Sequence, residues 1–154
     1  MKTMKRILVI LSALVLLVSL VSCDKSGSIK KAFEKENYDV KAYTGDDSNV
    51  QAIVTLMGLT EDQKKDIAEY EIIVVNKKTE GQSGLAGILE NIGSAVPDAV
   101  IVKFPSAGDL KDFMTVEKDG EKDTSAYDKA KEDGKINGNC WFAMGNDAAK
   151  EIFA

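Results

Sequence analysis

The sequence predicts an α+β domain, a single small sandwich in which helices pack against a mixed or antiparallel sheet. Segments with the alternation of strands and segments with the spacing of helices follow one another irregularly. Two runs, at 70–75 and 99–104, are rich in Val and Ile, and Asn137-Gly138 near the end is a strong hairpin-turn signal. The order of elements from Tyr70 onward is compatible with a ferredoxin-like plait.

The first part of the domain should hold a helix followed by a strand. Ser28 can cap a helix whose apolar residues, among them Ile29 and Phe33, fall on one face. The stretch 38–43 then alternates between apolar and polar side chains, which predicts a half-buried strand.

Two short helices are expected next. Apolar residues repeat at helical spacing in 50–57, with Ser48 or Asn49 as the capping residue. Thr60 and Gln63 have the spacing of a capping box, which predicts a second helix as far as about residue 68.

The runs 70–75 and 99–104 are the expected central strands. Between them, Leu85 and Ile88 belong to an apolar stripe at helical spacing, in 84–92. Glycines inside that stripe each cost a helix about 1 kcal/mol relative to Ala, so we expect a weak helix there.

The last third should contain two capped helices and a hairpin. Ser106 and Asn146 are placed to cap helices, and 117–123 is expected to be a charged loop. A strand somewhere in 127–136 should pair with 139–144 through the Asn-Gly turn.

The chain begins with a charged and then apolar leader. Lys2, Lys5 and Arg6 precede an apolar run from Ile7 to Val21, which only Ser12 and Ser19 interrupt. Asp24 follows soon after, so the run is shorter than the roughly 20 residues that a membrane span needs. Its length and flanks are typical of the hydrophobic region of a signal peptide.

The end of this leader, Leu20-Val21-Ser22-Cys23, resembles the lipobox of bacterial lipoproteins. The resemblance covers about the first 24 residues. It implies transfer of a diacylglyceryl group, with acyl chains such as palmitate, to the sulfur of Cys23, and cleavage between Ser22 and Cys23. Two acyl chains anchor a protein stably, whereas one does so only marginally. The alternatives are an ordinary secretory signal with a chance cysteine, or an uncleaved anchor.

This resemblance implies a domain organisation and a location. Residues 1–22 would be the removed signal peptide, 23–27 a lipidated tether, and 28–154 the single α+β domain. Asp24 after the cysteine resembles the signal for retention in the inner membrane. The domain would then lie at the extracytoplasmic face of the cell membrane, and its contact with the membrane would be through the lipid. The folded part is similar to small uncharacterised bacterial lipoproteins only in general pattern, which implies no activity.

The composition of the mature chain argues against several classes of function. The leader holds three of the 20 basic residues and none of the 25 acidic ones, so the mature chain carries 17 basic and 25 acidic residues, a net charge of −8. It contains neither Arg nor His. A nucleic-acid interface would want a basic face, and an imidazole base or ligand is excluded. We therefore expect no nucleic-acid partner and no cofactor.

The other chemical motifs are weak. Gly81-Gln82-Ser83-Gly84-Leu85 is similar to a nucleophile elbow but lacks the second Gly and any His. Alternating acidic residues in 119–123 could hold calcium, yet the rest of a calcium loop is missing.

Cys140 lies in an apolar run, where a small buried thiol is the better interpretation. Trp141 and Tyr43 could belong to an aromatic ligand platform, although core packing is the commoner role of such residues.

Strand alternation indicates one candidate binding surface. If all helices pack on one side of the sheet, a second apolar set near Ile73, Val75, Ile101 and Trp141 is left to face water. The apolar stripe with Leu85 and Ile88 is the expected loose cover of that set, and a partner would bind where the cover lifts.

The sequence therefore predicts a lipid-anchored envelope protein that acts by binding another envelope protein or an extracellular ligand. We expect it not to be an enzyme. The alternatives are a small envelope hydrolase or transferase, and a solute-capturing lipoprotein of a transporter. The oligomeric state is not predicted.

Overall fold

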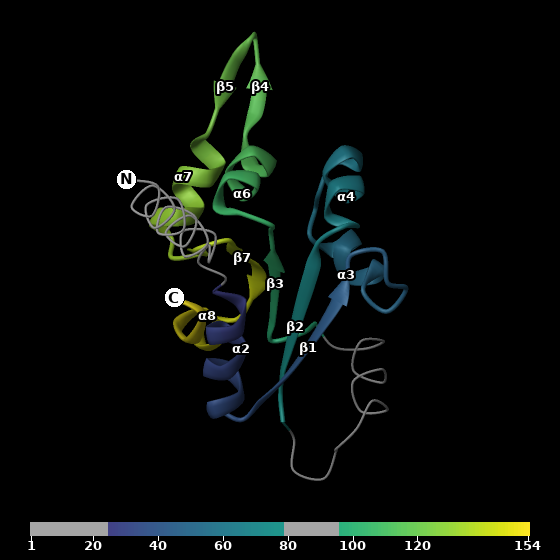
Figure 1. The fold of residues 1–154 in the computed structure, drawn as a ribbon, viewed down its shortest axis with the longest axis vertical. Coiled ribbons are helices and arrows are strands. Elements are labelled where there is room, and N and C mark those ends of the chain that lie inside the picture. Colours follow the sequence, from purple (N-terminus) through teal and green to yellow (C-terminus); the bar gives the residue numbers. More distant parts are fainter. Residues whose placement is uncertain (1–24, 79–95) are drawn as a thin grey trace, which may run out of the picture.

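The computed structural model describes residues 25–78 and 96–154. In these ranges the chain forms an α+β fold around a five-stranded sheet, as the sequence predicts (Figure 1). The elements, in chain order, are α2 (Ser26–Lys35), β1 (Tyr38–Thr44), α3 (Gln51–Leu56), α4 (Glu61–Ile67), β2 (Glu71–Lys77), β3 (Ala99–Lys103), α6 (Ala107–Met114), β4 (Val116–Lys118), β5 (Glu121–Asp123), α7 (Ser125–Glu132), β6 (Ile136–Asn137), β7 (Cys140–Gly145) and α8 (Asp147–Phe153).

The large sheet has the strand order β1-β2-β3-β7-β6, and every neighbouring pair is antiparallel. Successive strands β1, β2 and β3 are direct neighbours. A ferredoxin-like plait instead needs crossovers that skip a strand, with its helices on one face, so this variant of the predicted fold is not the one observed. Strands β4 and β5 form a separate two-stranded ribbon that projects beyond the sheet (Figure 1).

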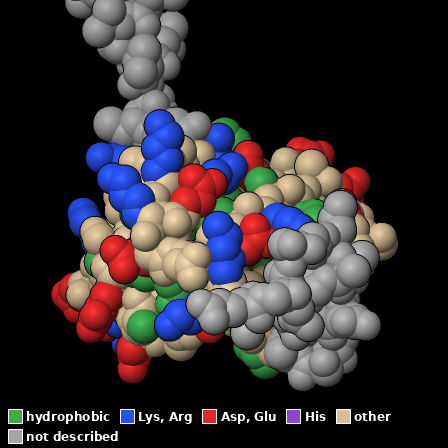
Figure 2. All heavy atoms as spheres, turned by 90° about the horizontal axis from the view of Figure 1, so that it is seen from below, with side chains coloured by type: hydrophobic (Ala, Val, Ile, Leu, Met, Phe, Trp, Pro, Cys, Tyr) green, Lys and Arg blue, Asp and Glu red, His purple; other side chains and the backbone are tan. Residues whose placement is uncertain are grey.

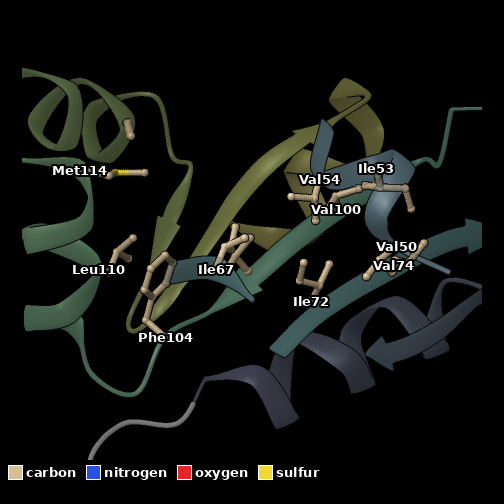
Figure 3. Close-up of a cluster of buried hydrophobic side chains, with 12 residues drawn as sticks. Val50, Ile53, Val54, Ile67, Ile72, Val74, Val100, Phe104, Leu110 and Met114 are labelled. Carbon is tan, nitrogen blue, oxygen red and sulfur yellow. The ribbon is translucent and has the colours of Figure 1, made fainter. Parts of the chain in front are cut away.

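Helices cover both faces of the large sheet, which gives the domain three layers. We call the side of α3, α4, α6 and α7 the first face and the side of α2 and α8 the second face (Figure 1). Figure 3 shows the first-face core, where Phe104 and Leu110 lie at one end and Val50 and Val74 at the other. The second-face core joins Phe33 of α2 and Phe153 of α8 to the strands. Alternation within each strand supplies both cores, because successive side chains point to opposite faces.

Several of the predicted local signals are confirmed. Thr60 and Gln63 form the capping box of α4, and the side chains of Ser106 and Asn146 cap α6 and α8. Gly138, with φ of 61°, forms part of the turn between β6 and β7.

The predicted N-terminal caps of two other helices, α2 and α3, are wrong. Helix α2 begins at Ser26 after Lys25, so Ser28 lies in its first turn and donates to the Lys25 carbonyl. No side chain caps α3, because Val50 and not Ser48 or Asn49 stands at its N-cap, and the Asp47 carboxylate accepts the backbone N–H of Asn49 in the preceding turn.

The region 115–137 differs most from the prediction. Most of the expected strand in 127–136 is helix α7, and only Ile136 and Asn137 pair with β7. The expected charged loop is the β4–β5 ribbon, whose turn places Asp119 and Gly120 at positive φ. Most side chains of both segments are exposed, so burial gives their sequence little of the periodicity from which strands and helices are predicted.

No helix in the described ranges is long and apolar enough to cross a membrane.

Candidate ligand-binding groove

The structure does not bring the predicted binding surface together. Ile73, Val75 and Ile101 are completely buried on the second face, beneath α2 and α8. Trp141 lies on the first face. Leu85 and Ile88 fall outside the described residues, so their part in covering the sheet stays a prediction.

The register of β7 against β3 explains the position of Trp141. Phe142 pairs with Ile101 and shares its face, which sends Trp141 to the opposite face with Val102. A register shift between Val100 and Ile101 then places Ala143 and Met144 on the same face as Trp141. Alternation within one strand separates two sets of side chains, but it does not say which sets of two strands share a face.

Trp141 instead lines a groove on the first face, which we call the Trp141 groove. It has a volume of about 390 Å³, within the range of small-molecule pockets. Its floor comes from β7 and its walls from α4, α6 and α7. The lining residues are Leu59, Gln63, Phe113, Met114, Val116, Ala126, Lys129, Ala130, Asp133, Lys135, Trp141 and Ala143.

A chain of aromatic contacts holds the floor in place. The ring of Phe104, which is fully buried, lies 5.1 Å from that of Phe113, and the Phe113 ring lies 6.0 Å from Trp141. Tyr70 completes the chain at 4.8 Å from Phe104. Tilted aromatic pairs at these separations stabilise one another beyond their burial, so the Trp141 ring is held from the core side.

Two walls of the groove are tied together by a single side chain. Gln63 belongs to the capping box of α4, and its Nε2 also donates to the carbonyl of Phe113 in α6 at 3.3 Å. A residue of the α4 capping box therefore also holds α4 close to α6.

The rim of the groove carries the charges. Lys129 belongs to α7, and Asp133 and Lys135 follow that helix, whereas most of the remaining lining is apolar. Val116, at the start of β4, leaves 57% of its surface exposed. No described residue accepts a hydrogen bond from the indole N–H of Trp141. The groove thus combines an apolar floor, an indole N–H that no described residue engages, and cations at its edge.

A second, larger depression of about 740 Å³ lies between α2 and α8. Its lining mixes Lys31, Lys35 and Lys77 with Glu36 and Glu151. Figure 2 shows one face of the molecule, on which Lys and acidic side chains are interspersed and the hydrophobic areas are small and separate. A depression lined by both positive and negative side chains does not favour a ligand of either charge. We therefore consider the Trp141 groove the better candidate binding site.

Tyr43, Tyr70 and Glu61 each have a shifted pKa whose cause lies in burial or in a nearby partner. Burial raises the pKa of the Tyr43 phenol, and the carboxylates of Asp47 and Asp39 add to this. Burial likewise raises the pKa of Tyr70. The pKa of Glu61 is lowered by its hydrogen bond with Lys64, which is a local partner on an exposed helix.

The other residues that the sequence singles out lie away from the groove or outside the described ranges. Cys140 is completely buried in the second-face core, as the apolar run predicts. Tyr43 is only partly buried and packs against the first-face core. In residues 25–78 and 96–154, no three His, Cys, Asp or Glu side chains gather closely enough to hold a metal ion. Ser22 and Cys23 precede the described residues.

Among the groove residues, the sequence indicates Trp141 as a candidate ligand contact, but it does not indicate Leu59 or Phe113. Phe113 has the helical phase of a core residue, and nothing local to it indicates a groove. The three residues come from parts of the chain that are far apart, so only the packing of α4 and α6 over β7 brings them together.

Comparisons of the chain with protein-family models, with curated proteins and with solved structures find no match.

Proposed function

We propose that this chain is a lipid-anchored binding protein of the bacterial cell envelope and that the Trp141 groove is its binding site. The lipobox-like sequence ending at Cys23 supports the anchor and its extracytoplasmic side. The partly exposed Trp141 on the floor of an apolar groove carries the proposal of binding. Aromatic side chains supply large contact area together with a polar handle, and they are enriched at recognition sites for this reason.

The groove best fits a ligand with a flat apolar body and an acidic end, either free or as part of a partner protein. The apolar body would lie on Trp141 and Ala143. Its acidic end would reach Lys129 or Lys135 at the rim, and Asp133 would disfavour a second negative charge nearby.

The binding half can be tested with the chain's own fluorescence, since Trp141 is its one tryptophan. The probe is 1-anilinonaphthalene-8-sulfonate, which has an apolar body and one anionic group. We expect saturable energy transfer from Trp141 to the probe in the wild-type protein.

Two matched variants locate the probe. Ala126 and Ala148 are both exposed alanines in the first turns of helices, but Ala126 lines the Trp141 groove and Ala148 lines the depression between α2 and α8. Ala126→Phe should fill the groove and weaken binding roughly tenfold, the effect of losing about 1.4 kcal/mol. Ala148→Phe should leave the affinity unchanged. Equal affinities for the two variants would place the probe elsewhere.

The anchoring half is tested at Cys23. Cys23→Ser should leave an unprocessed precursor that incorporates no labelled palmitate, because the acceptor thiol is gone. If the variant is still labelled and processed to mature size, the lipoprotein interpretation is wrong. This outcome is independent of the groove, whose test needs no lipid.

An envelope hydrolase or transferase and a solute-capturing lipoprotein stay as alternatives. No observation in the described residues selects a nucleophile for the first, and the Trp141 groove would serve the second as its capture site.

A further inference from the structure

The outer edge of β1 is the longest edge of the large sheet. β1 has seven residues and pairs with β2 on one side only, whereas β6, at the opposite edge, has two. No described strand pairs with the other side of β1. β1 contains no proline, and Ala42 on this edge is exposed. A long edge of this kind is a template for pairing with a further strand.

The hydrogen bonds at the two ends of β1 show which backbone groups face outward. Gly45 donates to the Tyr70 carbonyl at 3.0 Å, and Lys78 donates to the Asn37 carbonyl at 3.0 Å. Both contacts join residues that the β1–β2 register places opposite each other. Because hydrogen-bonded pairs alternate along an antiparallel ladder, the odd-numbered residues of β1 bond to β2. The N–H and C=O groups of Tyr38, Val40 and Ala42 therefore point to the outer edge.

Two opposite charges flank the middle of this edge. Asp39 and Lys41 stand on either side of Val40, and both side chains lie on the first face. Their side chains are 39% and 27% exposed, and the contact between them within the strand is long, at 3.9 Å. A surface ion pair of that length contributes little, so each charge is able to take a better partner.

We propose that this edge pairs with the same edge of a second copy of the chain, antiparallel, with a two-fold axis at Val40. Only registers that oppose outward-facing residues can form hydrogen bonds. With the axis at Val40, Val40 meets its own copy and Tyr38 meets Ala42. Asp39 then meets Lys41 of the other copy, and this ion pair occurs twice.

The charges select this register over its neighbours. Moving the axis by one residue places Lys41 opposite Lys41, or Asp39 opposite Asp39, and like charges directly opposite each other are destabilising. At the Val40 register the charged residues form the non-hydrogen-bonded pairs, in which the side chains of two strands come closest. Lysine alone on an edge strand usually prevents pairing. Lysine two residues from aspartate makes the edge complementary to itself, so the second copy is the partner that fits.

Charge reversal tests this pairing with built-in controls. The full chain is prepared with either of two affinity tags and purified in mild detergent, with micelles in large excess. The two preparations are mixed, one copy is captured through its tag, and the other copy is detected through its own tag. Wild-type protein should capture wild-type protein. Asp39→Lys with itself, and Lys41→Asp with itself, should each reduce capture roughly tenfold, because two attractive pairs become two repulsive ones.

Mixing the two variants should restore capture to the wild-type level. One copy then presents two lysines and the other two aspartates, so both cross-strand pairs are attractive again. Absence of wild-type capture, equal capture in every combination, or no recovery in the mixture would each overturn the proposal. Recovery in the mixture also shows that neither single variant is unfolded.

A second pair of variants tests the backbone rather than the charges. The N–H of Ala42 points away from β2, so Ala42→Pro removes a donor from the outer edge and leaves the β1–β2 ladder intact. Ala42→Pro should abolish capture, and Ala42→Val, which keeps the N–H, should not. Wild-type capture by Ala42→Pro would exclude strand pairing as the contact.

Discussion

Asn139 is the side chain on which three separate segments meet. Its side chain is buried, its Nδ2 donates to the Phe104 carbonyl at 2.6 Å, and its Oδ1 accepts the Lys25 N–H at 3.4 Å. Its backbone carbonyl also accepts the Phe104 N–H at 2.9 Å. A buried amide satisfied in this way holds the end of β3, the start of β7 and the entry to α2 together.

Asn139→Ala should lower the free energy of unfolding by about 1–3 kcal/mol, because the Phe104 carbonyl loses a donor inside the protein. Asn76→Ala is the control, since no described residue hydrogen-bonds to the Asn76 side chain, and it should change stability by less than about 0.5 kcal/mol. Urea denaturation measures both. Equal effects of the two substitutions would mean that water replaces the lost donor.

The same substitution, glycine to alanine, should change the free energy of unfolding in opposite directions at two positions. A Cβ on Gly45 would overlap the Ile67 carbonyl oxygen and lie 2.7 Å from its carbon, whereas a Cβ on Gly27 in α2 meets nothing within 4 Å. Gly45→Ala should therefore cost about 1–3 kcal/mol through overpacking. Gly27→Ala should stabilise the protein by about 0.5–1 kcal/mol, because alanine is the better helix former. Thermal unfolding separates the two, and a shift of the same sign in both would contradict the close approach at Gly45.

At the scale of elements, Asp98 and Asn146 fasten α8 to the sheet. The Asn146 Oδ1 accepts the Ala149 N–H at 2.8 Å, and its Nδ2 donates to Asp98 Oδ1 at 2.8 Å. The other Asp98 oxygen accepts the Lys77 N–H at 2.7 Å. One helix cap is thereby joined to the end of β2.

Asn146→Ala should cost about 1–2 kcal/mol, the upper part of the range for a lost cap, because it removes a cap and a link to the sheet together. Ser106→Ala at the exposed cap of α6 is the matched comparison and should cost about 1 kcal/mol or less. Amide exchange should show α8 opening more readily in the first variant. Unchanged exchange in α8 would show that its burial alone holds it.

Elements could be predicted from the sequence where burial or capping gives them a pattern. Thr60 with Gln63, Ser106 and Asn146 are local signals, and the structure uses all of them as predicted. Helix α7 differs from the strand that the sequence predicts because Ala130 is its only buried residue, so few apolar side chains mark its period. The groove could not be predicted in this way, because it depends on how far α4 and α6 stand from β7.

At the scale of the molecule, the position of α2 decides how the second face of the sheet is covered. The sequence shows two apolar sets on the central strands, but which helix lies over which set is fixed by long-range packing. The helix that precedes the sheet and the helix that follows it both lie on the second face, over Ile73 and Ile101. The sequence instead predicts the segment 84–92 as the cover of these residues, and that segment lies outside the described ranges.

A chain shortened to residues 25–154 should be soluble and unfold in one cooperative step, because it keeps Lys25 and the buried Ser26. A chain shortened further to 36–154 loses α2 and uncovers part of the second-face core. We expect this second form to bind 1-anilinonaphthalene-8-sulfonate strongly and to lose its sharp transition. Calorimetry and dye fluorescence compare them, and equal cooperativity would show that α2 is dispensable to the core.

The packing of α2 against α8 also sets an order of events in folding (Figure 1). α2 is the earliest of the described elements to emerge during synthesis, and its neighbour α8 is the latest of them. Contacts between such distant segments form late, because the whole intervening chain must close around them. The second face therefore cannot be completed before α8 has been made. A chain still being made leaves part of the second face open until α8 is free, and only then does α2 gain its contact with that helix.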